Sequence, residues 1–85
     1  MLSLNLHTHW GKDMEFTMTK AELNVLYALL NSGKSAKPRK IGAYYFYYTG
    51  SILCFNSSRS MKSIHDYTIQ DSASTILAKI KSALS

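Results

Sequence analysis

Positive charge and aromatic rings are concentrated in the middle of this chain. Between Glu22 and Asp66 the sequence contains no acidic residue. The basic residues in that interval are Lys34, Lys37, Arg39, Lys40, Arg59 and Lys62. An aromatic run lies between them, Tyr44-Tyr45-Phe46-Tyr47-Tyr48. Lysine and arginine contact phosphates and flat rings stack on bases, so this combination is typical of a nucleic-acid-binding surface.

Two histidines near the start of the chain indicate a second kind of chemistry. His7 and His9 flank Thr8, and an extended backbone would place their rings on one side, about 7 Å apart. Two imidazoles can chelate a metal ion, or act as general acid and base in phosphodiester cleavage. A metal site needs more ligands, and no other histidine or acidic residue has the spacing of a metal motif. We therefore expect solvent-facing histidines, with no catalytic residue, no metal and no cofactor.

Three further signals for chemistry are weak. Gly33-Lys34-Ser35 matches the end of a phosphate-binding loop, but the earlier glycine and the preceding strand are missing. No Gly-x-Ser-x-Gly sequence marks a nucleophilic serine. Cys54 is the only cysteine, which excludes an intrachain disulfide and a zinc site built on several thiolates. Its apolar surroundings predict a buried or half-buried thiol, and we expect the protein not to be an enzyme.

A hairpin is predicted at the start of the chain. Residues 2–10 alternate between apolar and polar side chains, which is the pattern of a strand with one buried face. A turn at 11–13 separates them from a second alternating run at 14–18. The two runs therefore predict paired antiparallel strands.

Two helices are predicted from their first residues and their apolar stripes. Thr19 and Glu22 form a capping-box pattern, in which each side chain accepts from the backbone N–H of the other residue. The apolar spacing that follows is helical, and Gly33 suits the left-handed position after the helix ends. Asp71 or Ser72 is expected to cap the last helix.

The middle of the chain predicts three strands. Its aromatic content favours extended structure, and Gly50-Ser51 fits a two-residue type II′ turn. The expected segments are a basic loop at 33–40, strands at 41–49, 52–57 and 64–70, and a second basic loop at 58–63. The predicted fold class is α+β in one domain, residues 1–85, with the order ββαβββα. Two helices would pack on one face of a twisted antiparallel sheet of about five strands.

The Gly50-Ser51 turn fixes a register for the central hairpin. Tyr45 should lie opposite Asn56, and Tyr47 opposite Cys54. The core face is expected to carry Tyr44, Phe46, Tyr48, Leu53 and Phe55. With both helices on that face, Tyr45 and Tyr47 would stand on an open face between the two basic loops.

The helix–strand–strand–strand–helix order from Thr19 to Ser85 resembles that of a double-stranded RNA-binding domain. That family has a lysine-rich entry to its final helix, where this chain has Asp71-Ser72-Ala73-Ser74. The resemblance is therefore one of topology, and it implies an RNA partner. In size and composition the chain is also similar to small phage-encoded inhibitors of host defence proteins, which implies a protein partner.

The net charge of +5 over 85 residues favours acidic partners. The leading hypothesis is a small basic, non-enzymatic protein that binds RNA or another single-stranded nucleic acid with low sequence specificity. The predicted contact residues are Lys34, Lys37, Arg39, Lys40, Tyr45, Tyr47, Arg59 and Lys62. The alternative is a phage-type inhibitor that blocks a host defence protein or nuclease through the tyrosine face or the basic loops. The same face would also suit a homodimer interface.

Location is predicted from the first residues and from hydropathy. The chain does not begin with a charged segment followed by an apolar run, so no signal peptide is expected. No stretch approaches the roughly 20 apolar residues of a membrane-spanning helix. We therefore expect a cytoplasmic protein without a membrane partner.

Overall fold

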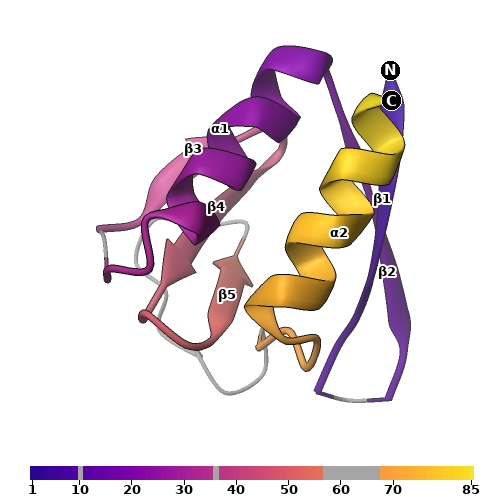
Figure 1. Cartoon of the computed structure of the whole chain (residues 1–85). Helices are drawn as coiled ribbons and strands as arrows, with labels where there is room; N and C mark the ends of the chain where they lie inside the picture. Colours follow the sequence, from indigo (N-terminus) through magenta and orange to yellow (C-terminus); the bar gives the residue numbers. More distant parts are fainter. Residues whose placement is uncertain (10, 36, 57–67) are drawn as a thin grey trace.

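The computed structural model describes residues 1–9, 11–35, 37–56 and 68–85 (Figure 1). In these ranges the chain forms two helices and two small antiparallel sheets, so the predicted α+β class is confirmed. The elements in chain order are β1 (Leu2–His7), β2 (Asp13–Met18), α1 (Lys20–Asn31), β3 (Arg39–Ile41), β4 (Tyr44–Tyr48), β5 (Leu53–Asn56) and α2 (Ala73–Leu84).

The strands β1 and β2 form the predicted hairpin. Their antiparallel register ends with His7 opposite Asp13, so β1 is shorter than predicted. Thr8 accounts for the earlier end, because its backbone N–H and its hydroxyl both donate to the Lys12 carbonyl, at 2.8 and 2.6 Å. Thr8 is fully buried, and these two bonds satisfy its polar groups at the start of the turn.

The strands β3, β4 and β5 form the second sheet, in that spatial order. Between β4 and β5, Tyr45 lies opposite Asn56 and Tyr47 lies opposite Cys54, which confirms the predicted register. Gly50 in the connecting turn has a φ of +100°, a conformation that glycine accepts readily.

The first part of this sheet differs from the prediction. The basic loop expected at 33–40 ends earlier, because β3 already begins at Arg39. The single strand expected at 41–49 is wrong, because two strands, β3 and β4, occupy this part of the chain. The chain instead reverses at Gly42, whose φ of +66° favours glycine, and Ile41 pairs with Tyr44 across the turn. The two basic residues just before Ile41 therefore lie in a strand rather than in a loop.

A single five-stranded sheet is not confirmed. The described residues form sheets of two and three strands, and Thr68 and Ile69 connect them through isolated bridges. Thr68 pairs with Cys54 of β5, and Ile69 pairs with Thr8 just beyond β1. The rest of the predicted third strand, residues 64–67, lies outside the described residues. The element types follow the predicted order, but the strands that fill it differ, so the order is not confirmed either.

The two helices begin as predicted. Thr19 accepts from the Glu22 N–H at 3.2 Å, and the Glu22 carboxylate accepts from the Thr19 N–H at 2.8 Å, which completes the capping box. Ser72 caps α2 by accepting from the Thr75 N–H at 3.3 Å. Gly33 has a φ of +68°, in the left-handed position predicted for it after α1.

One core joins the two sheets and the two helices. Both helices contribute buried side chains, and they lie side by side, with α1 over β3 and α2 along β1 (Figure 1). The Phe16 ring of β2 packs edge-on against three rings of the second sheet, at centroid distances of 5.0 to 5.4 Å, those of Tyr44, Phe46 and Phe55. These contacts hold the first hairpin against the second sheet. Tyr45 and Tyr47 do not belong to this core.

Candidate nucleic-acid interface

One face of the second sheet is turned away from the core. In β4 the side chains of Phe46 and Tyr48 are buried in the core, whereas Tyr45 and Tyr47 alternate with them and point to the other side. Lys40 of β3 lies opposite Tyr45. Directly opposed residues share a face of an antiparallel sheet, so this lysine side chain and this phenol ring are neighbours.

The segment before β3 brings more positive charge to the same face. Ser35, Lys37, Pro38 and Tyr47 line a small hollow of about 280 Å³. Lys37 is exposed, whereas the ring of Tyr47 is half-buried. Lys37 and Tyr47 therefore form a second lysine–tyrosine pair on this face, two residues along β4 from the pair of Lys40 and Tyr45.

Lys34 lies earlier in this segment, beside the turn between β4 and β5. The segment passes so close to Gly50 that an added Cβ there would lie 3.6 Å from the Gly33 carbonyl oxygen and 3.9 Å from the Ser35 nitrogen. Lys34 itself is exposed. The lysines at positions 34, 37 and 40 therefore follow one stretch of chain that borders β4.

This face is less open than predicted. Tyr45 and Tyr47 are half-buried, and the neighbouring strand β5 is closed on both sides. On the outward side of β5, Cys54 is only 2 % exposed and Asn56 only 7 % exposed. The accessible part is therefore confined to β3, β4 and the segment that precedes them.

Cys54 is the buried thiol that the sequence predicts. Burial raises the pKa of this thiol above its ordinary value, although a hydrogen bond with the Thr68 side chain opposes the shift. The thiol is the unreactive form of cysteine, and a raised pKa keeps it protonated at neutral pH. Cys54 therefore contributes packing rather than chemistry to this face.

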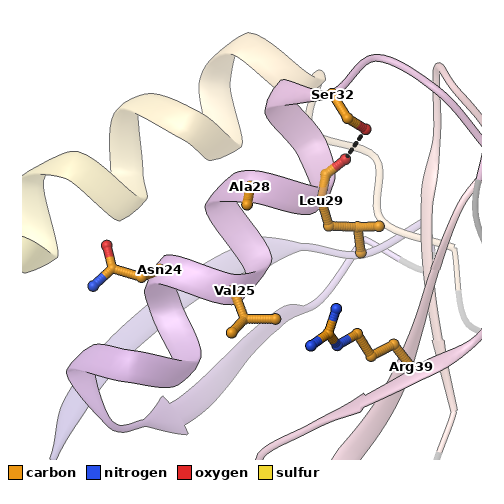
Figure 2. Close-up of a pocket in the computed structure, with 6 residues that line it drawn as sticks. All are labelled: Asn24, Val25, Ala28, Leu29, Ser32 and Arg39. Atoms are coloured by element: carbon orange, nitrogen blue, oxygen red, sulfur yellow. Dashed lines mark hydrogen bonds between the residues drawn. The ribbon is translucent and has the colours of Figure 1, made fainter.

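Arg39 is separated from the tyrosines. It lies opposite the core residue Phe46, so its side chain leaves β3 on the face opposite to that of Lys40. Figure 2 shows its guanidinium group directed toward α1, where it lines a hollow with side chains of that helix. Arg59 and Lys62, the other two predicted cations, lie outside the described residues.

The two histidines do not share a site. The Nδ1 atom of His7 lies 2.9 Å from a carboxylate oxygen of Asp13, whereas His9 is exposed. Within the described ranges, no group of three histidine, cysteine, aspartate or glutamate residues could hold a metal ion. The His7–Asp13 contact joins the ends of β1 and β2, where the hairpin register stops.

An ion pair that sequence reasoning missed lies at the same end of the hairpin. Asp71 accepts from the Lys79 ammonium at 2.9 Å and from the His7 backbone N–H at 3.1 Å. Burial raises the pKa of Asp71, but these hydrogen bonds and the Lys79 charge outweigh it, so the pKa lies below its ordinary value. Lys79 also donates to the Asn5 carbonyl at 3.0 Å, so it fastens α2 to β1. No local pattern links these residues, since only the packing of α2 on β1 brings them together.

No protein-family model, curated protein or solved structure matches this chain. Neither helix in the described part of the chain is long and apolar enough to cross a membrane. The candidate interface consists of exposed lysines that border two half-buried tyrosine residues.

Proposed function

We propose that this chain is a small, basic, non-enzymatic protein that binds RNA, or another single-stranded nucleic acid, through one face of the second sheet. The contact residues would be Lys34, Lys37, Lys40, Tyr45 and Tyr47. The observation that supports this most directly is the position of Lys40 opposite Tyr45, with Lys37 beside Tyr47. A phosphate contact and a stacking surface thereby come within reach of one strand. A cytoplasmic location belongs to the same proposal.

The aromatic part of the face suits bases. Neighbouring side chains already restrict the motion of a half-buried tyrosine ring. A base that stacks on the ring therefore costs little additional side-chain entropy. Stacking on an aromatic side chain contributes about 1–3 kcal/mol per base, and every base offers a flat face for it. We therefore expect low sequence specificity.

The cationic part of the face makes the affinity depend on salt. The net charge of +5 attracts a polyanion from a distance, and the exposed lysines neutralise phosphates on contact. Each neutralised phosphate of a single strand contributes about −0.7 to the slope of log K against log salt, so contacts from the three lysines predict a slope of about −2.

Fluorescence anisotropy with a labelled single-stranded RNA of about 12 nucleotides tests this proposal. Affinity should fall steeply as salt rises, and Tyr47→Ala should weaken binding about 5- to 150-fold through the lost stack. Tyr47→Phe keeps the ring and is the matched control, which should bind like the wild type. A flat salt response, or equal affinity for Tyr47→Ala and the wild type, would contradict the proposal.

The competing function is a small inhibitor that blocks a host defence protein or nuclease. It would act through the tyrosine face or the basic loops, and an apolar hollow between α1 and Arg39 offers it a further surface. Sedimentation of the purified protein with and without RNA separates the two functions. A monomer or dimer that RNA does not shift would favour the inhibitor.

A further inference from the structure

A hollow of about 480 Å³ lies between α1 and β3, on the side of β3 that faces away from the two outward tyrosines. Its lining residues are Asn24, Val25, Ala28, Leu29, Ser32 and Arg39 (Figure 2). Val25, Ala28 and Leu29 have the spacing of neighbours on one face of a helix. They form a second apolar stripe on α1, beside the buried stripe of Leu23, Leu26 and Leu30. Val25 and Leu29 are half-buried at the edge of the core, and Ala28 is exposed.

Arg39 gives this hollow a positive charge that no acidic group of the described residues neutralises. Figure 2 shows its guanidinium group across from the apolar side chains of α1. Of the four acidic residues that the structure describes, Asp13 contacts a histidine, Asp71 pairs with a lysine and Glu22 completes the capping box. The fourth, Glu15, lies on β2 and forms no ion pair with Arg39. No carboxylate of the described residues is therefore placed to pair with Arg39, and a ligand that brings one could pair with it in a bidentate fashion.

The shape of the hollow selects the kind of ligand. Asn24, Ala28, Ser32 and Arg39 are exposed, so the hollow is an open groove along α1 rather than an enclosed cavity. A small molecule that needs about 70–90 % of its surface buried does not fit such a groove. Addition of a strand to β3 is also disfavoured, because β3 has only three residues and follows Pro38. A helix laid along the groove meets neither obstacle.

We infer that this groove, hereafter the α1 groove, binds an acidic amphipathic helix of a partner protein. Apolar side chains of the partner rest on Val25, Ala28 and Leu29, and an aspartate or glutamate pairs with Arg39. Because Arg39 and Lys40 leave β3 on opposite faces, this site is separate from the proposed nucleic-acid face. The inference therefore goes beyond RNA binding and does not depend on it.

The experiment is a selection of displayed helical peptides on the wild-type protein, with counter-selection on a variant carrying both Arg39→Gln and Ala28→Glu. Ala28→Glu places a carboxylate in the α1 groove, where it neutralises Arg39 from within and covers the apolar stripe. Enriched peptides should carry an acidic residue next to apolar residues at helical spacing. The strongest synthetic peptide should bind each single variant at least about tenfold more weakly than the wild type.

Ala78→Glu is the matched control, because it makes the same exchange at an exposed position in the middle of α2. It changes the net charge equally and should leave peptide affinity as in the wild type. Circular dichroism of both glutamate variants verifies that each remains helical.

Several results would overturn the inference. Enriched peptides without acidic residues would contradict the proposed ion pair with Arg39. Peptides that bind Ala28→Glu as tightly as the wild type would show that they do not bind in the α1 groove. Displacement of the peptide by single-stranded RNA would place it on the tyrosine face instead. A wild-type dimer that Ala28→Glu dissociates and Ala78→Glu does not would make a second copy of the chain the occupant.

Discussion

The two faces of β4 differ although their residues are nearly the same. Toward the core, Phe46 is fully buried and Tyr48 is 3 % exposed, whereas Tyr45 and Tyr47 keep part of their rings accessible on the other side. The position of each residue along the strand determines this difference, because successive side chains point to opposite faces of the sheet. The number of tyrosines in a run therefore does not tell how many rings a ligand can reach.

The same alternation separates two adjacent cations in β3. Lys40 shares a face with Tyr45, whereas Arg39 lies opposite Phe46 and points toward α1. A cluster of basic residues in sequence thus becomes two sites of different character. One is a lysine beside a tyrosine ring, and the other is an arginine beside apolar side chains of a helix.

The largest difference between the two faces should appear in stability. Phe46→Ala removes a fully buried ring that packs on Phe16, and should lower the free energy of unfolding by about 3–5 kcal/mol. Tyr47→Ala removes a half-buried ring outside the core, and should lower it by no more than about 1.5 kcal/mol. Denaturant unfolding followed by circular dichroism measures both. Equal losses would show that the outward face is part of the core.

The next prediction concerns the closed half of the outward face. Cys54 is buried and burial raises its pKa, so less thiolate is present at any given pH than for an ordinary cysteine. A thiol reagent at pH 8 should label the native protein on the order of 100-fold more slowly than the denatured protein, because labelling must wait for local opening. Rapid native labelling at pH 8 would mean that the face is open across β5.

Removal of a single hydroxyl group tests the same difference between the two faces of β4 with a smaller change. Tyr48 donates from its hydroxyl to the Gly50 carbonyl at 3.0 Å, so Tyr48→Phe should lower the free energy of unfolding by about 0.5–1.5 kcal/mol. In the described part of the chain the Tyr47 hydroxyl has no such bond, and Tyr47→Phe should be neutral within about 0.5 kcal/mol. Thermal unfolding of the two variants side by side provides the measurement. A larger loss for Tyr47→Phe would reverse the assigned roles.

The sequence predicts those features that depend on neighbours along the chain. Thr19 and Glu22 specify the start of α1 through the capping box, and the turn at Gly50 specifies the register of β4 and β5. The turn at Gly42 was missed although a glycine inside a strand pattern is a recognised sign of a break. The aromatic residues that follow Gly42 made the whole stretch look like one strand.

The features that the sequence does not predict depend on packing between distant elements. Arg39 reaches the α1 groove only because β3 exists and α1 lies over it. In the second apolar stripe of α1, Val25 and Leu29 pack against the edge of the core and also line the α1 groove, and helical spacing alone does not reveal the second role. The contacts of Asp71 with His7 and of Lys79 with Asn5 likewise require α2 to lie against β1.

The smallest effect gives the sharpest test of the two faces. Lys40→Gln and Arg39→Gln each remove one positive charge from adjacent residues, so both variants lose the same long-range attraction for RNA. Lys40→Gln should also lose a phosphate contact, which makes the slope of log K against log salt shallower by about 0.7. Arg39→Gln should keep the wild-type slope, because its side chain points toward α1. Anisotropy titrations at several salt concentrations measure both slopes. An equal change of slope in both variants would mean that RNA contacts both faces of β3. The difference between the two faces would then be a property of the fold that does not determine where RNA binds.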